Sequence, residues 1–527
     1  MVTTISGQML RALAAALAAA ALITPLAAQA APKTERVIVV YKQGAAKAAR
    51  DAVTRAGGRV LLNLGEVNAV AVRLPAGARD ALAANPNVES VEADPERHIM
   101  GGRTSAGKRI TAGVSTEQVP YGITMVQADQ VTFQADKAKT LCIVDSGYDI
   151  AHEDLPHSNV SGVDLTGSGI GDWNTDEASH GTHVAGTIAA IGGNGIGVVG
   201  VVPTGTMSIR ISKVFDASGS APSSVIIKGV LQCNKAKAQI ISMSLGGGRP
   251  TKFEQKIYDY LASKDVLVIA AAGNAGDTTT SYPAGYPSVM SVAAIDANMA
   301  HAGFSQTNAD VEISGPGVDV LSTVPLGSQT AATTTVGASA YGVQPMDGSP
   351  RTSATGPLAD FGLGDSPVPG SMSGKVCLIS RGTISFADKV VNCQNSGGVG
   401  AIIYNNTSGE LFGTLGGTAT TIPSVGALQS DGATMLGQVG QSATVSVFGT
   451  TDQYAEYSGT SMATPHVSAV AALVWSKHPG CTAAQLRDSL NKSALDLGAS
   501  GRDDQFGFGL VQAKAAHERI KSLGCGN

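Results

Sequence analysis

The sequence predicts an α/β fold in which helices cover both faces of a parallel β-sheet. Short apolar runs alternate with helical stretches from Val119 onward, an order typical of parallel sheets. Several runs are apolar throughout, as expected of strands buried on both faces. The alternation stops near Leu326 and resumes at Tyr454, so a β-rich insertion is expected between them. A small α+β segment is expected before Val119.

The N-terminus is typical of a signal peptide. Arg11 precedes a mostly apolar run, Ala12 to Leu26, and Ala28-Gln29-Ala30 has the small-x-small pattern of a cleavage site. A membrane anchor is the alternative, but the run is shorter than the roughly 20 residues needed to cross a bilayer. We therefore expect export, and a mature chain without a membrane span.

The segment after the signal has the element order βαββαβ. A Gly/Ser/Thr/Lys-rich stretch, Gly101 to Thr116, then has the composition of an exposed linker. The expected strands are Val37–Tyr41, Val60–Leu62, Ala69–Leu74 and Val88–Glu92, and the expected helices are Ala45–Ala56 and Ala78–Ala84.

The main domain is expected to be discontinuous. Its strands are Leu141–Val144, Ile209–Phe215, Ile240–Leu245, Val266–Ala271 and Val289–Ala294, and its helices are His180–Ile191, Val225–Ala238, Phe253–Ser263, one opening at Gly459 and running to about Lys477, and Ala483–Asn491. The insertion is expected to contain strands Val376–Ser380, Ala401–Tyr404 and Ile422–Val425, and a helix near Phe386–Ser396.

Composition excludes some functions. Charged residues make up 15%, the net charge is −5, and no basic patch is present that would bind nucleic acid. The six cysteines form no C-x-x-C pair and none lies near a histidine at zinc-site spacing. In an exported chain an even number of cysteines favours disulfides, although free buried thiols remain an alternative.

Four polar residues are candidates for chemistry, and each has an ordinary alternative. Asp145 ends a buried strand, where ligand sites form in parallel sheets, but Asp is also common before Ser-Gly turns. His180 starts a helix; the spacing to His183 is wrong for a zinc-protease pair, so His183 is expected to be structural. Ser461 opens a helix whose free N–H groups can stabilise an oxyanion, or it is a plain N-cap. Asn274 follows a strand and can donate to the same oxyanion, or form a turn.

Together these segments resemble the subtilisin-like serine proteases. The similarity rests on VDSGYDIAHEDL, HGTHVAGTIAA, SMSLGG, AAGN and YSGTSMATPHVSA, in the order Asp, His, Ser. It implies that Asp145 orients His180, that His180 takes the proton of Ser461, and that Ser461 attacks the peptide carbonyl. Asn274 and the Ser461 backbone N–H would hold the oxyanion.

The resemblance also implies a substrate cleft. Ser244, Leu245 and Gly246 would pair with the substrate backbone and form one wall of the S1 pocket, the pocket for the residue before the scissile bond. Ala271, Ala272 and Gly273 would form the opposite wall. No charge is evident in these walls, so broad cleavage after apolar or bulky residues is expected, with Asp277 at an unknown place on the rim.

A structural calcium site follows from the same resemblance. Asp154 matches the family's carboxylate ligand, and the loop Ile191–Val198 matches its calcium loop. Asn194 would supply a side-chain oxygen, and Glu117 or Gln118 could complete the site. Backbone oxygens would come from Ile191, Ile196 and Val198, with the register of Ile191 open. A plain glycine-rich turn is the alternative.

The βαββαβ segment resembles the family's inhibitory propeptide, to be cut off between about Met100 and Thr116. The insertion resembles a protease-associated domain through GKVCLISRGTISFADKVVNCQNSGGVGAIIYNN. From this resemblance we expect the disulfides Cys377–Cys393, Cys481–Cys525 and Cys142–Cys233. The expected division is residues 1–30 signal, 31–116 propeptide and linker, 117–326 and 454–527 peptidase, and 327–453 insertion.

The resemblance makes the expected function a secreted serine endopeptidase, monomeric, acting on proteins and peptides and inhibited by its own propeptide. A peptide ligase or cyclase would use the same residues. An inactive peptide-binding protein is the alternative of a different class, against which the intact set Asp145, His180, Ser461 and Asn274 argues.

Overall fold

The computed structural model describes residues 33–100, 102–103, 116–167, 172–407, 411, 413–415 and 418–527. The expected signal peptide and most of the linker that follows Met100 lie outside these residues. The chain forms two compact units, Met1–Val91 and Glu92–Asn527, which are described separately. Among the described residues, no helix is long and apolar enough to cross a membrane.

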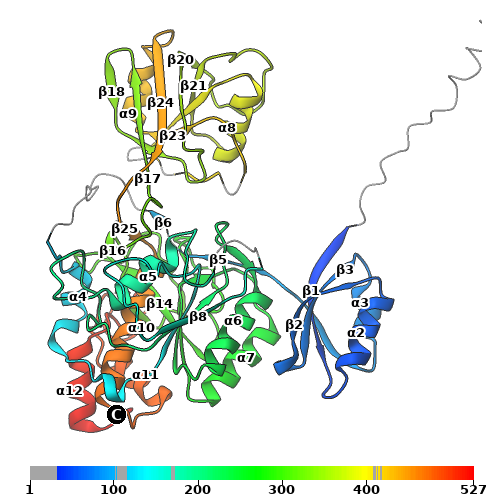
Figure 1. Cartoon of the computed structure of the whole chain (residues 1–527), viewed down its shortest axis with the longest axis vertical. Coiled ribbons are helices and arrows are strands. Elements are labelled where there is room, and N and C mark those ends of the chain that lie inside the picture. The colour runs from blue at the N-terminus through cyan, green and yellow to red at the C-terminus, as the bar shows by residue number, and fades with distance from the viewer. Residues whose placement is uncertain are drawn as a thin grey trace, which may run out of the picture. The chain divides into compact units, whose positions relative to one another are not determined.

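The first unit has the predicted βαββαβ order. Its sheet has the strand order β2-β3-β1-β4, and β1 and β2 both run antiparallel to β3. The helices α2 and α3 cover one face of this sheet (Figure 1) and pack on alternate apolar residues of its strands. The elements are β1 (Thr34–Tyr41), α2 (Ala46–Arg55), β2 (Arg59–Leu64), β3 (Ala69–Pro75), α3 (Arg79–Ala83) and β4 (Val88–Ala93).

The second unit is built on a seven-stranded parallel sheet with the order β15-β14-β13-β11-β7-β9-β8. The fold class predicted from the sequence is therefore confirmed. The strands are β7 (Leu141–Asp145), β8 (Val160–Asp164), β9 (Ile209–Lys213), β11 (Ile240–Met243), β13 (Leu267–Ala271), β14 (Val289–Ile295) and β15 (Ile313–Pro316). The edge strand β8 was not predicted, because its sequence VSGVD is partly exposed and lacks an apolar run.

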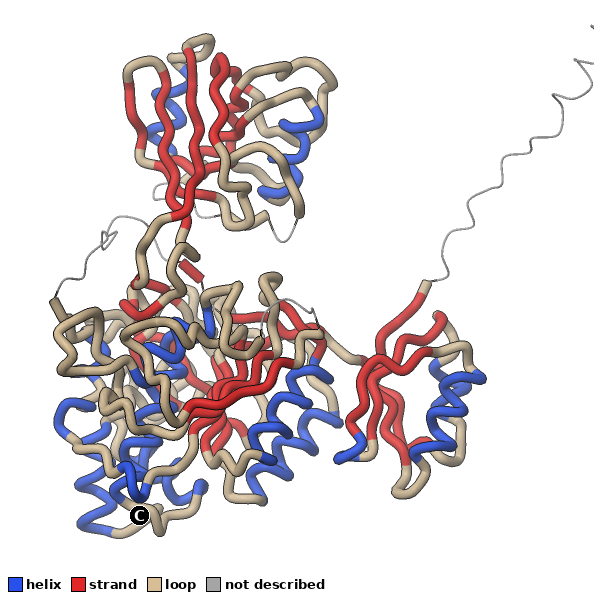
Figure 2. Tube along the Cα trace, viewed as in Figure 1, coloured by secondary structure: helices blue, strands red, loops and turns tan. Residues whose placement is uncertain are grey.

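Helices cover both faces of this sheet (Figure 2). On one side α6 (Ser223–Lys235) and α7 (Lys252–Ser263) pack against β7, β9 and β13. On the other side lie α5 (His180–Ala189) and α10 (Thr460–Lys477), which pack against each other and against the sheet, followed by α11 (Ala483–Lys492) and α12 (Ala513–Leu523). A helix buried on all sides is apolar all round, which explains the Ala-rich sequence of α10.

The insertion forms a separate sheet with its own apolar cores. An antiparallel pair, β16 (Val320–Thr323) and β25 (Tyr454–Ser458), flanks it in sequence. The three predicted strands correspond to β21, β22 and β23, and the predicted helix to α8. Its elements are β17 (Thr330–Val336), β18 (Ser339–Tyr341), β19 (Val343–Pro345), β20 (Ser353–Asp360), β21 (Val376–Ser380), α8 (Phe386–Asn395), β22 (Gly400–Tyr404), β23 (Ser424–Ala427), α9 (Gln429–Leu436) and β24 (Ser442–Gly449).

Three disulfides join the pairs expected from the sequence. Cys142–Cys233 links β7 to α6, Cys377–Cys393 links β21 to α8, and Cys481–Cys525 holds the C-terminal tail. The described residues contain no free cysteine. The first of these bonds fixes the strand that ends at Asp145 to the helix covering it.

Candidate active site

The candidate catalytic residues meet at the carboxyl edge of the parallel sheet. Asp145 is the last residue of β7, His180 the first residue of α5, and Ser461 lies in the first turn of α10. All three are buried. His180 Nδ1 lies 2.8 Å from Asp145 Oδ1, so the carboxylate can hold the proton on Nδ1 and leave Nε2 free to act as a base.

Ser461 makes two hydrogen bonds of different kinds. Its backbone N–H donates to the carbonyl oxygen of Met100 at 3.0 Å. Its hydroxyl donates to the carbonyl oxygen of Ser244 at 2.8 Å. Since the hydroxyl has one proton, Ser461 Oγ does not donate to His180 Nε2 in this arrangement, and Nε2 has no hydrogen-bond partner.

Met100 directly follows a strand that occupies the cleft. The strand β5 (Glu96–Ile99) lies between β10 (Ser220–Pro222) and β12 (Leu245–Gly246) and is antiparallel to both. The Met100 N–H donates to Ser244 O at 3.1 Å. The chain therefore fills its own cleft with an extended segment whose last residue, Met100, lies beside Ser461. This mode of binding is known as β-augmentation.

The two predicted walls differ in their contacts with this segment. Ser244, Leu245 and Gly246 all bond or pair with it. A Cβ on Gly246 would clash with Ser281 Oγ and lie 2.8 Å from the Met100 methyl carbon. In the opposite wall, Ala271 and Ala272 are buried at the end of β13, and the Gly273 N–H donates to Thr460 Oγ1 at 3.2 Å.

Asn274 follows that wall and is held by α10. Its side-chain oxygen accepts the Thr460 N–H at 2.9 Å and the Thr460 hydroxyl at 2.7 Å. With the oxygen occupied, the amide nitrogen is the end that remains to donate to a ligand. Asp277 lies farther along the loop, where its exposed carboxylate accepts the N–H and hydroxyl of Thr279 at 2.9 and 2.6 Å.

This geometry agrees with the comparisons with known proteins. The subtilase family model matches residues 136–359 and 417–509, and the PA domain model matches residues 336–435. The chain belongs to the subtilase family. It is therefore a serine-type endopeptidase with an inserted PA domain.

Individual relatives cover most of this subtilase. Subtilisin E of Bacillus subtilis (strain 168) is 29% identical over 505 residues, 93% of each chain. The crystal structure of the psychrophilic subtilisin-like protease Apa1 from Pseudoalteromonas sp. AS-11 is 42% identical, covers 78% of this chain and 100% of its own, and has a TM-score of 0.53. Fervidolysin from Fervidobacterium pennivorans, at 22% identity and a TM-score of 0.59, shares the fold.

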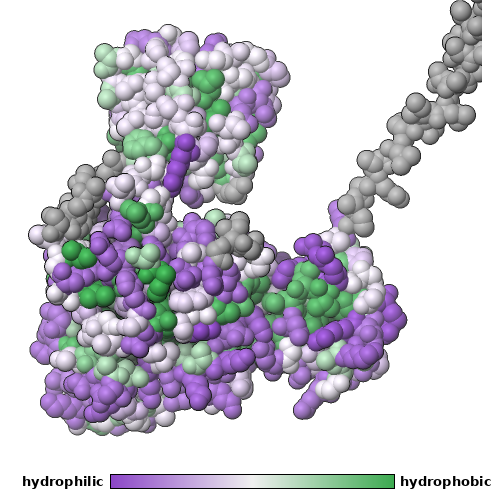
Figure 3. Space-filling model, viewed as in Figure 1, coloured by the Kyte–Doolittle hydropathy of each residue, from purple (hydrophilic) through white to green (hydrophobic). Residues whose placement is uncertain are grey.

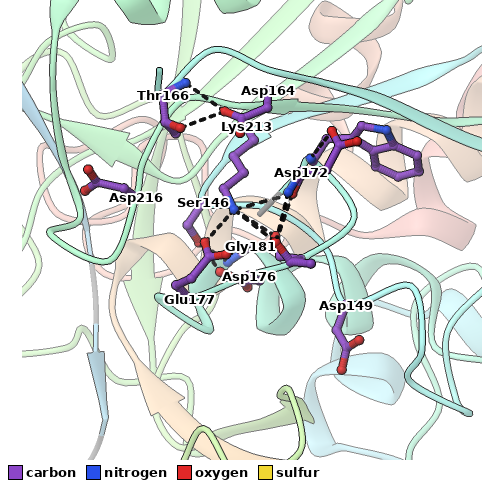
Figure 4. A network of polar contacts seen from close by, with 12 residues as sticks. Ser146, Asp149, Asp164, Thr166, Asp172, Asp176, Glu177, Gly181, Lys213 and Asp216 are labelled. Atoms are coloured by element: carbon purple, nitrogen blue, oxygen red, sulfur yellow. Dashed lines mark hydrogen bonds and ion pairs between the residues drawn. The ribbon is translucent and has the colours of Figure 1, made fainter. Parts of the chain in front are cut away.

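A second buried carboxylate of the subtilase, Asp176, was missed by the sequence analysis. Ser146 Oγ donates to Asp176 at 2.8 Å, and the N–H and hydroxyl of Thr182 both donate at 2.7 Å. Figure 4 shows it beside Ser146 and Gly181. Burial raises the pKa of Asp176. The Ser146 backbone N–H donates to Asp145 at 2.8 Å, and the Gly181 N–H donates to Ser146 Oγ at 2.9 Å. The network therefore ties β7 to the start of α5.

Lys213 at the end of β9 borders the same network (Figure 4). Its ammonium group is buried, lies 3.1 Å from the carbonyl oxygen of Thr175 and pairs with Glu177. The loop that precedes His180 is thus held by a lysine on the sheet as well as by Asp176. The only sequence signal for this support was the acidic stretch NTDEASH before the helix.

His183 is structural, as expected. Its ring stacks on Tyr457 with centroids 4.3 Å apart, and its Nε2 lies 2.9 Å from the carbonyl oxygen of Val320. Burial lowers the pKa of His183 to about 3. It is therefore neutral at the pH at which His180 would act.

The predicted calcium loop surrounds Asp154. One carboxylate oxygen accepts the Asn194 side-chain amide at 2.7 Å and the other the Val198 N–H at 2.8 Å. Glu117 accepts the N–H of Gly193 at 2.6 Å. Burial first, and the charge of Glu117 in addition, raise the pKa of Asp154 to about 6. In the part of the chain that the structure describes, no three His, Cys, Asp or Glu side chains group as a metal site.

Proposed function

We propose that this subtilase is exported as a zymogen, cleaves itself after Met100 and then hydrolyses proteins through an acyl-enzyme on Ser461. The observation that carries the proposal is the position of Met100, whose carbonyl oxygen accepts the Ser461 N–H at 3.0 Å. That is where a scissile carbonyl must lie for attack by the same residue's hydroxyl.

The reaction follows from the residues in place. Ser461 Oγ turns from the Ser244 carbonyl to His180 Nε2, gives up its proton and attacks the carbonyl carbon. Asp145 keeps the imidazole oriented and stabilises its positive charge. The Ser461 N–H and the Asn274 amide hold the oxyanion, and His180 protonates the leaving amine before water releases the acyl group.

The propeptide role is proposed on the same contacts. After the Met100–Gly101 bond is cut, β5 would remain bonded between β10 and β12 and block the cleft until it is degraded. We propose residues 1–30 as the signal peptide, 31–100 with the linker to residue 116 as the inhibitory part, 117–326 and 454–527 as the peptidase, 327–453 as the PA domain, and a secreted monomer as the mature form.

The test is to purify the full chain and the variant Ser461→Ala. The full chain is expected to yield a fragment beginning at Gly101, and a fluorophosphonate should label it at Ser461. The variant should keep its N-terminal segment and remain unlabelled. Processing of the pure variant would show that another protease makes the cut, and failure to label the mature wild type would refute the protease mechanism.

We propose that the enzyme accepts a broad range of residues before the scissile bond, with apolar and bulky side chains cleaved best. Met100 is itself such a residue, and it lies against Gly246. Asp277 is engaged by Thr279 rather than by the segment in the cleft. A peptide library varied at this position should show high kcat/KM for Met, Leu and Phe. A profile dominated by Lys or Arg would contradict the proposal.

Calcium binding is proposed for the Asp154 loop. Its fit rests on two acidic side chains, Glu117 and the buried Asp154, which both bond to one glycine-rich loop and supply the carboxylate oxygens that Ca²⁺ selects. Asp154, Asn194 and Glu117 would hold the ion, with backbone oxygens of Ile191, Ile196 and Val198, and the bound ion would stabilise the loop.

Removing calcium should therefore lower the melting temperature of the Ser461→Ala variant by several degrees, and adding it back should restore the loss. Asp154→Asn is expected to remove most of this response, whereas Asp388→Asn in the PA domain should leave it unchanged. A melting temperature that does not respond to chelation in the parent protein would contradict the site.

A further inference from the structure

Arg97 lies buried in the cleft four residues before the proposed cleavage point, counting Met100 as the first. Its side chain is completely buried, although Glu96 and His98 beside it are exposed. Side chains of a strand alternate between two faces, so β5 directs Arg97 into the protein and its neighbours outward. A subsite for this residue is therefore built into the peptidase.

The partner of Arg97 is Glu254 in the first turn of α7. Arg97 Nε donates to Glu254 Oε1 at 3.2 Å and Nη2 pairs with the other carboxylate oxygen. This is the two-point contact by which a guanidinium matches a carboxylate. The Glu254 side chain is completely buried too, so the pair is shielded from solvent.

The remaining polar atoms of this subsite are also engaged. Arg97 Nη2 donates to the carbonyl oxygen of Arg249 at 2.8 Å, and Nη1 donates to that of Glu96 at 3.2 Å. Tyr286 donates its hydroxyl to Glu254 at 2.9 Å. A Cβ on Gly247 would lie 2.7 Å from the Glu96 carbonyl oxygen and 3.1 Å from Nη1, so a glycine leaves room for β5 and for the guanidinium.

A buried carboxylate needs such a partner. Burial raises the pKa of Glu254, while the charge of Arg97 lowers it. An apolar side chain in the same place would leave the carboxylate without its counter-charge in a dry site, which is unfavourable. A lysine would supply charge but only one point of contact.

We infer that Glu254 makes this subtilase selective for arginine at the fourth residue before the scissile bond of its protein substrates. The inference rests on the proposed function, because it assumes that substrates follow the path of Glu96–Met100. An alternative is that the Arg97–Glu254 pair serves only to fold the zymogen, in which case the mature enzyme would not discriminate.

The experiment uses mature wild-type enzyme and peptides with the chain's own sequence around Met100, varied only at the Arg97 position. Arginine, lysine, citrulline, leucine and alanine are compared by kcat/KM. Citrulline keeps the shape of arginine without its charge. The arginine peptide should be cleaved about 10- to 100-fold faster than the citrulline, leucine and alanine peptides, with lysine between.

The variant Glu254→Gln should cut the arginine peptide about 10- to 100-fold less well and leave the citrulline peptide unchanged. Asp259→Asn is the matched control, because Asp259 is exposed on the same helix. If Glu254→Gln does not mature, the pair can be exchanged as a unit, Arg97→Leu with Glu254→Leu, and that protein should prefer leucine.

Rates within threefold of each other across the five peptides in the wild type would overturn the inference. So would an arginine preference that survives Glu254→Gln or the paired exchange. Fluorophosphonate labelling keeps the two proposals apart. An enzyme that labels and cleaves without this preference refutes only the subsite, whereas one that does not label refutes the proposed mechanism.

Discussion

The peptidase sheet and the PA-domain sheet place their polar groups differently. Within the described residues, the peptidase part buries Asp145, Asp176, His180, Lys213 and Glu254, whereas Lys389 is the one buried ionisable side chain in the insertion apart from its disulfide cysteines. The visible surface of the insertion is mostly of intermediate hydropathy, and that of the peptidase is more strongly hydrophilic (Figure 3). Buried charge is costly, so its concentration in the peptidase part indicates where chemistry is performed.

The strongest test of this difference is Asp145→Asn. An amide can donate to His180 Nδ1 and so stabilise the wrong tautomer, and kcat should fall about 10⁴-fold. Asp388→Asn makes the same change at the start of α8 in the insertion and should leave kcat unaltered. Active-site titration with steady-state kinetics measures both. A loss of less than tenfold at Asp145 would remove it from the triad.

The next largest effect is expected at the oxyanion. Asn274→Ala removes one donor that acts only in the transition state, so kcat should fall about 10²- to 10³-fold with little change in KM, a range measured in a related subtilisin. The matched change in the insertion is Asn392→Ala, which should not affect kcat. A rise in KM at constant kcat would instead indicate a role in ground-state binding.

Stability should separate the two regions as well. Removing Cys377–Cys393 by a double Cys→Ser change opens a loop between residues 16 apart and should cost the insertion about 3 kcal/mol of unfolding free energy. The peptidase has its own core, so kcat/KM on a short peptide should stay within a factor of two. Calorimetry follows the insertion's transition. A parallel loss of activity would show that the two sheets are coupled.

A smaller, pH-dependent effect is expected at His466 in α10. Burial lowers its pKa to about 4, below the unfolded value near 6.5, so the unfolded chain binds a proton that the folded chain does not. His466 therefore costs stability as pH falls from about 6.5 to 4. We compare the Ser461→Ala protein with the same protein carrying His466→Asn as well. The unfolding free energy of the first, relative to the second, should fall by about 1.4 kcal/mol for each pH unit of acidification in this range.

Urea unfolding at several pH values measures this gap, the difference in unfolding free energy between the two proteins. Comparing the variant with its parent cancels the opposite effect of buried carboxyls such as Asp154, whose pKa is raised. The transition of the insertion serves as the internal control, because none of its described residues is a buried histidine. A gap that does not vary with pH would mean that His466 is already exposed to solvent in the folded state.

Sequence analysis predicted the parallel sheet because buried strands such as β7 and β13 are apolar throughout. It predicted less of the insertion. Strands β17 and β20 are rich in Ser, Thr and Ala and alternate only weakly, β24 alternates but has only short apolar side chains at most of its buried positions, and α9 has little apolar character. Pairing between distant segments stabilises such strands, and a local pattern does not reveal it.

The site shows the same limit. Asp145, His180, Ser461 and Asn274 lie in motifs and could be predicted, whereas Asp176 and Glu254 depend on contacts between segments far apart in the chain. Arg97 and Glu254 are 157 residues apart, and each by itself resembles an ordinary exposed charge. Their burial together is a property of the fold.

The strand β5 lies extended between β10 and β12 and pairs with both of them. A helix or a paired strand in a folded protein cannot offer its backbone groups for such pairing until it detaches from its own neighbours. The cleavage rate of a folded protein should therefore depend on how often a stretch of about five residues unfolds locally. It should depend less on how many preferred residues that stretch contains. For folded substrates the cleavage rate would therefore measure local unfolding. Proteins that rarely unfold locally would resist cleavage whatever their sequence.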